Sequence, residues 1–422
     1  MCEGRTLCRV TAKLYGNWID GRWRASESGA FFEVGERVGT LERWARSSAT
    51  DVDAAFRSAT NGAPRWSRLK RAERVDLLRR VPSALDLDVL EPALARDLGL
   101  ETGELRERLE LELFRFGEAI EIVAEGADQT GVGLFQAHWS DLVGGVGARL
   151  ATRLVAGQCA VLLSHPLLPR AGDAFARAFE DADLPLGVVT LLHGDTNEPL
   201  EASCAAPQLV FARLKERDER LETSVARCAA RPHVQVAAWR VANATAIVRQ
   251  SDDVRARAAE VIDRCLGRSS TLSAQFPGQI ARVLCHQRNF SRFSEELLAC
   301  LESSTDAQRP VAPLEPYLAE HVTDAWSLGL DEGATPIFGA VPQDRRDEDD
   351  TSPPYAIGAP PSSARGGVRP IVFTNVDPRS GLALLTRPAP LLGLVRTSSD
   401  EQALELQHEL DGLPTLSPRA HA

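Results

Sequence analysis

The stretch IARVLCHQRNFSRFSEELLACL, residues 280–301, holds the pattern that decides the fold class. It begins with Ile280–His286, an apolar run with the length of a buried strand. The residues that follow place apolar side chains on one helical face: Phe290, Phe293, Leu297, Leu298 and Leu301. A strand followed directly by an amphipathic helix is typical of parallel crossover connections, so this stretch predicts an α/β protein.

The same alternation extends along the rest of the chain. Thr50 is predicted to cap a helix with Asp53 three residues on. The buried face of that helix would carry Val52, Ala55, Phe56 and Ala59. Further short apolar runs predict strands that helices cover on both faces. These runs are Cys159–Leu163, Val188–Leu192, Gln208–Ala212, Ala244–Val248, Pro370–Phe373 and Leu391–Val395.

Composition narrows the possible partners and the compartment. The 422 residues, 44% hydrophobic and 25% charged, are enough for two or three domains. A net charge of -11 opposes binding to nucleic acid and to anionic membrane surfaces. The chain shows neither a membrane-spanning apolar run nor a signal peptide at Met1–Val10, so we expect a cytoplasmic protein. Its eight cysteines form no C-x-x-C pair, which favours buried thiols over zinc sites or disulfides.

Residues 342–367 differ in composition from their surroundings. They combine a run of charges with Pro, Gly and Ser and contain few side chains that could be buried. We predict a disordered surface loop here. Its role stays open between a tolerated insertion and a regulatory or docking segment.

Several motifs, in order along the chain, resemble those of NAD(P)-dependent aldehyde dehydrogenases. The resemblance extends from about Leu14 to about Leu413 and implies an α/β fold like theirs. It implies a Rossmann-like cofactor-type domain at 1–232 and a second, catalytic-type α/β domain at 233–422, with the 342–367 loop inside it. The motifs are LYGNWIDGRW (14–23), DVDAAFRSATNGAPRWSRLKRAERVDLLRRV (51–81), ARLATRLVAGQCAVLL (148–163), DADLPLGVVTLLHGD (181–195) and EGATPIFGA (332–340).

The positions that the resemblance assigns to catalysis hold different residues. Pro277 stands where the family has its cysteine nucleophile, and it offers no nucleophilic atom. Trp239 stands at the glutamate base, and an indole cannot accept a proton at neutral pH. Ser140 replaces the asparagine that helps to hold the oxyanion, although a hydroxyl can still donate a hydrogen bond. Cys265 and Cys285 are poorly placed to substitute for the nucleophile.

The positions that the resemblance assigns to NAD(P) are replaced as well. From these replacements we expect no cofactor. The alternative is that Arg213 or Lys215 binds a phosphate directly. The replaced positions are Leu163 and Pro166 after an apolar run, Arg213 and Asp218 in the phosphate-binding turn, and Thr386 at the nicotinamide ribose.

The chain also lacks a counterpart of the family's closing strand after Leu413, so we expect a C-terminally shortened member with an unpaired sheet edge. We therefore predict a divergent pseudoenzyme with no catalytic, cofactor-binding or metal residues. It would be a non-catalytic structural or regulatory partner of an active aldehyde dehydrogenase paralogue or of another protein. Three alternatives stay open: a divergent NAD(P)-dependent aldehyde oxidoreductase, a nucleotide or aldehyde sensor without turnover, and a decayed gene.

Overall fold

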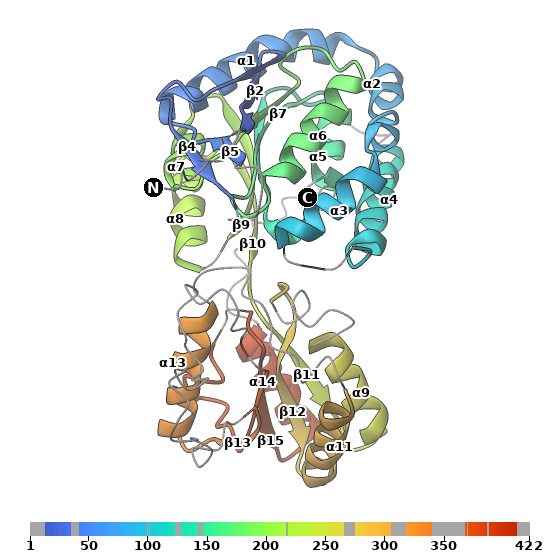
Figure 1. Ribbon diagram of the computed structural model, residues 1–422, viewed down its shortest axis with the longest axis vertical. Coiled ribbons are helices and arrows are strands. Elements are labelled where there is room, and N and C mark those ends of the chain that lie inside the picture. The colour runs from blue at the N-terminus through green and yellow to red at the C-terminus, as the bar shows by residue number, and fades with distance from the viewer. Residues whose placement is uncertain are drawn as a thin grey trace, which may run out of the picture. The chain divides into compact units, whose positions relative to one another are not determined.

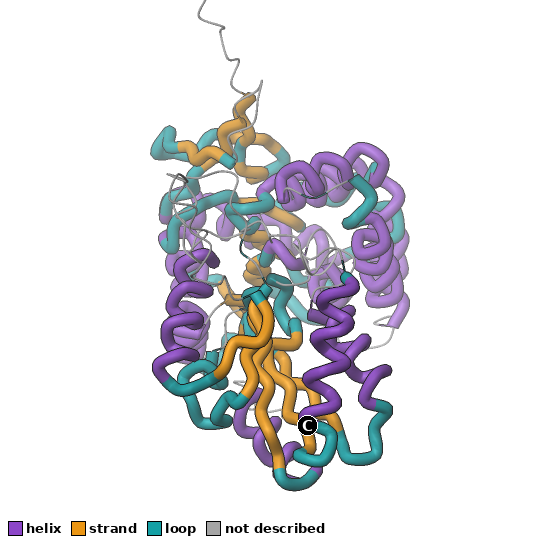
Figure 2. The backbone as a smooth tube through the Cα atoms, turned by 60° about the horizontal axis from the view of Figure 1, so that its bottom comes forward, coloured by secondary structure: helices purple, strands orange, loops and turns teal. Residues whose placement is uncertain are grey.

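The structure, a computed structural model, divides the chain into two compact units between Trp239 and Arg240 (Figure 1). The domain boundary predicted from the sequence, after residue 232, lies just before the last strand of the first unit. In Figure 2 helices flank the strands. The described residues are 13–34, 42–98, 100, 102–122, 128–141, 147–216, 218–265, 275–304, 318–339, 368, 370–385 and 388–411.

The first unit contains two sheets and most of the helices. Its strands are β1 (Lys13–Tyr15), β2 (Asn17–Ile19), β3 (Arg22–Arg24), β4 (Phe31–Glu33), β5 (Glu42–Ala45), β6 (Val132–Gln136), β7 (Cys159–Leu163), β8 (Val189–Leu192), β9 (Leu209–Glu216) and β10 (Gln235–Arg240). Its helices are α1 (Ala49–Arg68), α2 (Arg71–Leu78), η1 (Pro82–Ala84), α3 (Leu87–Leu98), α4 (Arg106–Ile122), η2 (Trp139–Asp141), α5 (Gly147–Val155), α6 (Pro169–Asp181), α7 (Glu198–Ala205) and α8 (Asp218–Ala229).

Within the described residues, the main sheet of this unit has seven strands in the order β10-β9-β6-β7-β8-β2-β3. Strands β9, β6, β7 and β8 run parallel to one another, and β2 joins β8 in the antiparallel direction. Helices α5 and α6 pack on one face, and α1 and α7 pack on the other (Figure 1). Strand β6, whose five residues are all buried, is central to this arrangement and is absent from the strands that we predicted.

Helix α1 begins two residues earlier than the sequence pattern indicated. Its N-cap is Ser48, which accepts a hydrogen bond from the backbone N–H of Asp51, while the Asp51 carboxylate accepts one from the N–H of Ser48. The predicted cap at Thr50 and Asp53 is therefore wrong, because both residues are already helical. A capping side chain must precede the first helical residue in order to reach its unpaired N–H groups. The predicted apolar face is confirmed: Val52, Ala55, Phe56 and Ala59 are buried.

The second unit is built on a five-stranded sheet of the described residues, in the order β11-β12-β15-β14-β13. Four of its strands are parallel and β13 is antiparallel to β14. The elements are β11 (Ala244–Val248), α9 (Val254–Cys265), β12 (Ile280–His286), α11 (Phe290–Ser303), α13 (Leu318–Asp331), β13 (Thr335–Phe338), β14 (Ile371–Thr374), β15 (Leu391–Thr397) and α14 (Asp400–Asp411).

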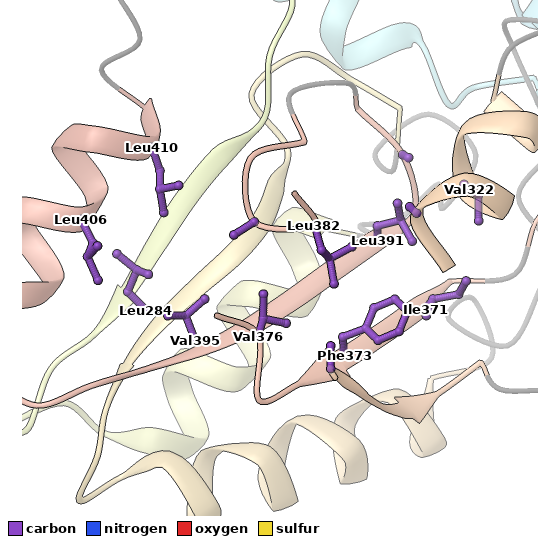
Figure 3. Close-up of a cluster of buried hydrophobic side chains, with 14 of the residues drawn as sticks. Leu284, Val322, Ile371, Phe373, Val376, Leu382, Leu391, Val395, Leu406 and Leu410 are labelled. Carbon is purple, nitrogen blue, oxygen red and sulfur yellow. The ribbon is translucent and has the colours of Figure 1, made fainter. Parts of the chain in front are cut away.

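Two hydrophobic clusters cover the two faces of this sheet. One packs α9 and α11 against it through residues such as Val261 and Phe293. The other includes α13 and α14, where Leu406 and Leu410 lie near Leu284 and Val395 of the sheet (Figure 3). The stretch 280–301 thus forms β12 and α11, as predicted. The mixed α/β class with parallel sheets is confirmed, and within the described ranges no helix is long and apolar enough to cross a membrane.

Candidate functional site at the switch point of the parallel sheet

The candidate site lies where the strand order of the first unit reverses. The chain passes from β6 to β7 to β8 on one side and then returns to place β9 on the other side of β6. In open α/β sheets, ligands bind outside the carboxyl ends of the strands at such a switch point. The carboxyl ends of β6 and β9 meet here because Phe135 pairs with Arg213 in parallel register.

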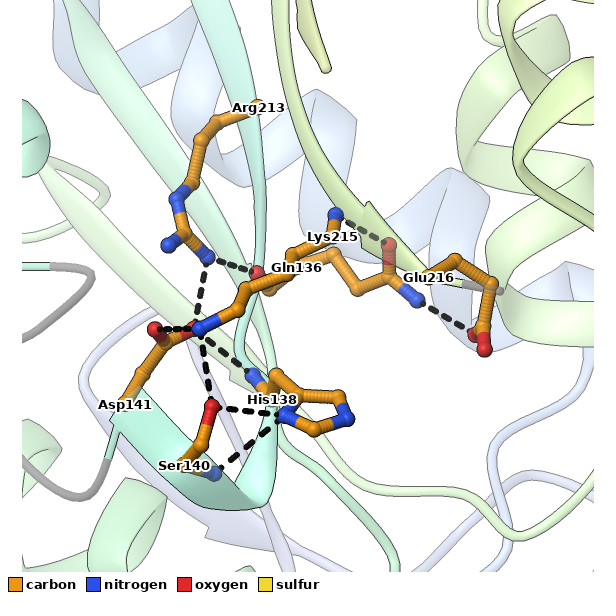
Figure 4. A network of polar contacts seen from close by, with 7 residues as sticks. All are labelled: Gln136, His138, Ser140, Asp141, Arg213, Lys215 and Glu216. Carbon is orange, nitrogen blue, oxygen red and sulfur yellow. Dashed lines mark hydrogen bonds and ion pairs between the residues drawn. The ribbon is translucent and has the colours of Figure 1, made fainter. Parts of the chain in front are cut away.

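Charged and polar side chains from these two strand ends form one network (Figure 4). The guanidinium of Arg213 donates from Nη1 to the backbone oxygen of Gln136 at 2.6 Å and to Oδ2 of Asp141 at 2.9 Å. Nζ of Lys215 donates to Oδ1 of Asp141 at 2.7 Å and to Oγ of Ser140 at 2.8 Å. One carboxylate therefore holds two cations, and the side chains of Asp141 and Arg213 are each only 6% exposed.

Burial and charge act against each other in this network. Burial by itself would raise the pKa of Asp141, but the adjacent Arg213 and Lys215 outweigh it and hold the pKa well below its ordinary range. Burial lowers the pKa of Lys215, and the pairing with Asp141 opposes that shift. The paired charges stabilise each other because water is largely excluded from them.

His138 completes the network beside Ser140. Its Nδ1 lies 2.8 Å from Oγ of Ser140 and accepts the backbone N–H of the same residue at 3.3 Å. Burial, followed by the nearby His165 and Lys215, lowers the pKa of His138 well below its ordinary value. The imidazole is therefore neutral at physiological pH, and the lone pair of its Nδ1 accepts from Ser140.

Trp239, at the position that the resemblance assigns to the glutamate base, lies half-buried in β10. The guanidinium of Arg213 lies 5.3 Å from its ring centroid, and that of Arg149 lies 5.1 Å from it. The indole thus contacts two cations, an arrangement in which it acts as a π-surface and not as a base.

The described positions that the resemblance assigns to the cofactor lie in or after strands β7 and β9. Leu163 ends β7 and is buried, and Pro166 follows it in a turn. Strand β9 continues as far as Glu216, and Asp218 is the first residue of α8. Thr386 lies outside the described residues, as do 342–367 and everything after Asp411.

In the second unit, Pro277 lies half-buried in the turn before β12. The two cysteines nearest to it in the sequence, Cys265 and Cys285, belong to the apolar cluster that packs α9 and α11 against the sheet. Burial raises the pKa of each of these thiols to about 12. A thiol with so high a pKa is not the thiolate that acts as a nucleophile.

The sequence singles out Ser140, Arg213 and Lys215 but not Asp141, the common partner of the two cations. The sequence did contain a signal for this network: polar residues follow the β6 segment, and two basic residues lie near the end of the β9 segment. No group of His, Cys, Asp and Glu suited to a metal ion occurs in the part of the chain that the structure describes.

Comparison with characterised proteins gives relatives that are aldehyde dehydrogenases. The chain is 27% identical over 225 residues to fluoroacetaldehyde dehydrogenase of Streptantibioticus cattleyicolor, a match that covers 47% of this chain and 43% of that protein. It is 25% identical over 366 residues to N-succinylglutamate 5-semialdehyde dehydrogenase of Burkholderia multivorans, covering 78% of this chain and 72% of that one.

Solved structures with the same fold include cofactor complexes. An NADP-dependent glyceraldehyde-3-phosphate dehydrogenase from Bacillus halodurans, complexed with NADP, matches with a TM-score of 0.79 at 15% identity, covering 94% of this chain and 84% of that one. An aldehyde dehydrogenase from Pseudomonas syringae, complexed with NAD+ and octanal, matches with a TM-score of 0.74 at 18% identity, covering 94% and 82%. The expected fold, like that of the aldehyde dehydrogenases, is confirmed.

These complexes correct our expectation that no cofactor is involved, because proteins of this fold bind NAD+ or NADP. The expectation considered only individual side chains. A dinucleotide at a switch point also meets backbone groups at the strand ends, which a comparison of side chains does not test.

The residues at the β6–β9 switch point fit such a group in part. Arg213 and Lys215 are the cations at the carboxyl end of β9 that would hold a phosphate, and both are already paired with Asp141. Leu163, by contrast, offers no donor to a ribose hydroxyl. Hydride transfer is the chemistry that the dinucleotide supplies when it is bound.

The family itself follows from a match that includes most of the chain. Residues 143–411 match the model of the aldehyde dehydrogenase family, a range that spans part of the first unit and all described elements of the second. Together with the shared fold, this match shows that the chain belongs to the aldehyde dehydrogenase family.

Proposed function

We propose that this chain is a divergent family member that has lost covalent aldehyde oxidation and acts as a structural or regulatory partner protein. An active aldehyde dehydrogenase paralogue is the first partner to test. Aldehyde oxidation in this family begins when a cysteine thiolate adds to the aldehyde, and that step needs both a thiolate and a base.

The observation that carries the proposal is the state of the nucleophile position. The resemblance assigns Pro277 to it, and the nearest cysteines in the sequence, Cys265 and Cys285, lie in the core with pKa values raised to about 12 by burial. Trp239 at the base position is engaged with Arg149 and Arg213. Losing either a nucleophile or a base costs several orders of magnitude in rate, and the resemblance assigns a different residue to both positions.

The test is an oxidation assay with the full chain, purified from a host in which contaminating dehydrogenases are excluded by a mock purification. Short aliphatic and semialdehyde substrates are offered with NAD+ and with NADP+, and reduced nicotinamide is followed by absorbance. We expect no turnover above the mock. Turnover that co-elutes with the chain in gel filtration and that iodoacetamide abolishes would overturn the proposal.

A second candidate function is a dinucleotide sensor without turnover. It is favoured by the two cations of the switch point, Arg213 and Lys215, and by the NAD+ and NADP complexes of relatives. Ligand that binds only the folded state at about 100 times its dissociation constant adds about 2.7 kcal/mol of stability. Thermal unfolding with millimolar NAD+ or NADP+ therefore tests it: a raised midpoint that Lys215→Met reduces supports the sensor, and an unchanged midpoint rejects it.

A further inference from the structure

One face of helix α4 exposes apolar side chains. Leu111 is 46% exposed, Phe114 is 61% exposed and Ile122 is 78% exposed. The opposite face is buried against the first unit, mainly against α5, and Figure 1 shows α4 at the outer edge of that unit. Single exposed apolar residues are common on protein surfaces, but several of them on one helix face indicate an interaction surface.

Four exposed residues of this face lie in one line along the helix: Leu111, Arg115, Glu118 and Ile122. The steps between them are four, three and four residues, which is the spacing of the contact line between paired helices. Phe114 lies one residue before Arg115 and flanks the line. We call these five residues the α4 seam.

The order of the residues makes the α4 seam complementary to itself. When two copies meet antiparallel, with the twofold axis midway between Arg115 and Glu118, Leu111 lies opposite Ile122 of the second copy. The same axis places Arg115 opposite Glu118 of the second copy. Because the symmetry repeats each contact, two pairs of opposite charge lie at the centre and one apolar pair lies at each end. A parallel arrangement would instead place Arg115 opposite Arg115.

The two charges at the centre of the seam are available for such contacts. Within the described residues neither Arg115 nor Glu118 has an ion pair. Burial lowers the pKa of Arg108, Glu112 opposes that shift, and the like charge of Arg115 adds to it. Arg115 therefore has a cationic neighbour on its own helix, and a carboxylate from a second copy would relieve this repulsion.

We propose that the α4 seam binds the α4 seam of a second copy, which gives an antiparallel, twofold-symmetric dimer of this chain. The contact uses one helix of the first unit and no sheet edge. It goes beyond the proposed function, because it assigns a surface and a partner of the same sequence. The 17 residues of α4 extend over about 25 Å. One helix from each copy makes a small interface, so we expect a dissociation constant of roughly 10–100 µM.

Sedimentation equilibrium of the full chain, without aldehyde or dinucleotide, tests this proposal. Loading concentrations from about 1 to about 500 µM bracket the expected constant. The average mass should rise from that of one chain toward that of two chains across this range. Arg115→Glu should raise the dissociation constant by about tenfold or more, because it places two pairs of like charges at the centre of the dimer. Glu118→Arg should have the same effect.

The two charge variants also test the orientation of the helices. In a mixture of Arg115→Glu and Glu118→Arg, the antiparallel heterodimer recovers two pairs of opposite charge, so the mixture should associate like the unaltered chain. The double variant should do so as well, because it only exchanges the two charges. Arg255→Glu, at an exposed residue of α9 in the second unit, is the control for net charge and should leave the dissociation constant unchanged.

A matched pair of leucines tests the apolar ends of the seam. Leu111→Asn removes an apolar contact from both ends of the dimer and should raise the dissociation constant by about tenfold. Leu404, in α14 of the second unit, is 45% exposed, nearly as much as Leu111. Leu404→Asn should therefore leave the dissociation constant unchanged.

Three results would contradict the proposal. One is a chain that stays monomeric at the highest concentration. Another is a dimer that Arg115→Glu leaves unchanged, because that dimer would form through a different surface. The third is a mixture of the two charge variants that stays monomeric although circular dichroism shows both to be folded. None of these results depends on the aldehyde assay, so failure here and failure of the proposed function are separate outcomes.

Discussion

Trp239 and Arg213, which the sequence separates by a helix and a turn, are neighbours: the guanidinium carbon of Arg213 lies 5.3 Å from the ring centroid of Trp239. The resemblance assigns one position to the general base and the other to a glycine of the phosphate-binding turn. In the fold these two side chains are in contact, and Arg213 is also hydrogen-bonded to Asp141. The three residues therefore form a single network, which can be tested as a unit.

Removing the charge of Asp141 should be costly. Asp141→Asn leaves two buried cations, Arg213 and Lys215, without their carboxylate. Breaking one side of a buried ion pair typically costs about 3–5 kcal/mol. Urea unfolding should show a decrease of that order in the free energy of unfolding. The control is Asp195→Asn, which breaks the more exposed pair with Arg46 and should cost about 1 kcal/mol or less. Equal effects of the two variants would contradict a buried network.

Stability should fall as the pH is lowered below about 6.5. Burial lowers the pKa of His193 to about 3, and within the described residues its Nε2 meets no hydrogen-bonding partner. A folded-state pKa below the unfolded value gives stability that is complete above pH 6.5 and is lost toward pH 3. Each such histidine contributes a slope of up to about 1.4 kcal/mol per pH unit. His193→Gln should flatten the slope in urea unfolding between pH 4 and 6, whereas His233→Gln, at an exposed residue, should not.

The internal thiols should be unreactive in the folded protein. Burial raises the pKa values of Cys159, Cys265 and Cys285 to about 12, so little thiolate is present. Iodoacetamide followed by peptide mapping should label these three only after guanidinium is added. Cys300, half-buried in α11, is the internal reference and should react first. Rapid labelling of Cys265 or Cys285 in the folded protein would instead support an unconventional cysteine nucleophile. It would therefore favour the alternative that the chain is an aldehyde oxidoreductase.

The start of α1 offers a direct test of the corrected cap. Ser48→Ala removes the oxygen that accepts the N–H of Asp51 and should lower the free energy of unfolding by about 1 kcal/mol. Thr50→Ala, at the exposed position that the sequence pattern predicts as the cap, should change it by about 0.5 kcal/mol at most. A larger loss from Thr50→Ala than from Ser48→Ala would restore the original assignment.

The local pattern of apolar residues was sufficient to predict many of the strands and helices. The predicted strands at Cys159–Leu163, Ala244–Val248 and Ile280–His286 have the observed bounds. A strand or helix face is set by spacing over a few residues, which the sequence displays directly. The pattern was insufficient for β6, where Gly133 and Gln136 interrupt the apolar run. The place of Gly133 in a strand becomes clear only when its neighbours are known, since an added Cβ would lie 2.8 Å from the ring of Phe135.

The sequence by itself determined the α/β class and the family resemblance, because these depend on residue type and short-range order. The tertiary structure alone decided that Ser140, His138 and Lys215 share one hydrogen-bonded cluster. Lys215 lies 75 residues beyond Ser140. The reversal of strand order brings the ends of β6 and β9 together, and no local pattern encodes which strands become neighbours. The low pKa of His138 and the pairing of Asp141 follow from that proximity and from the burial it creates.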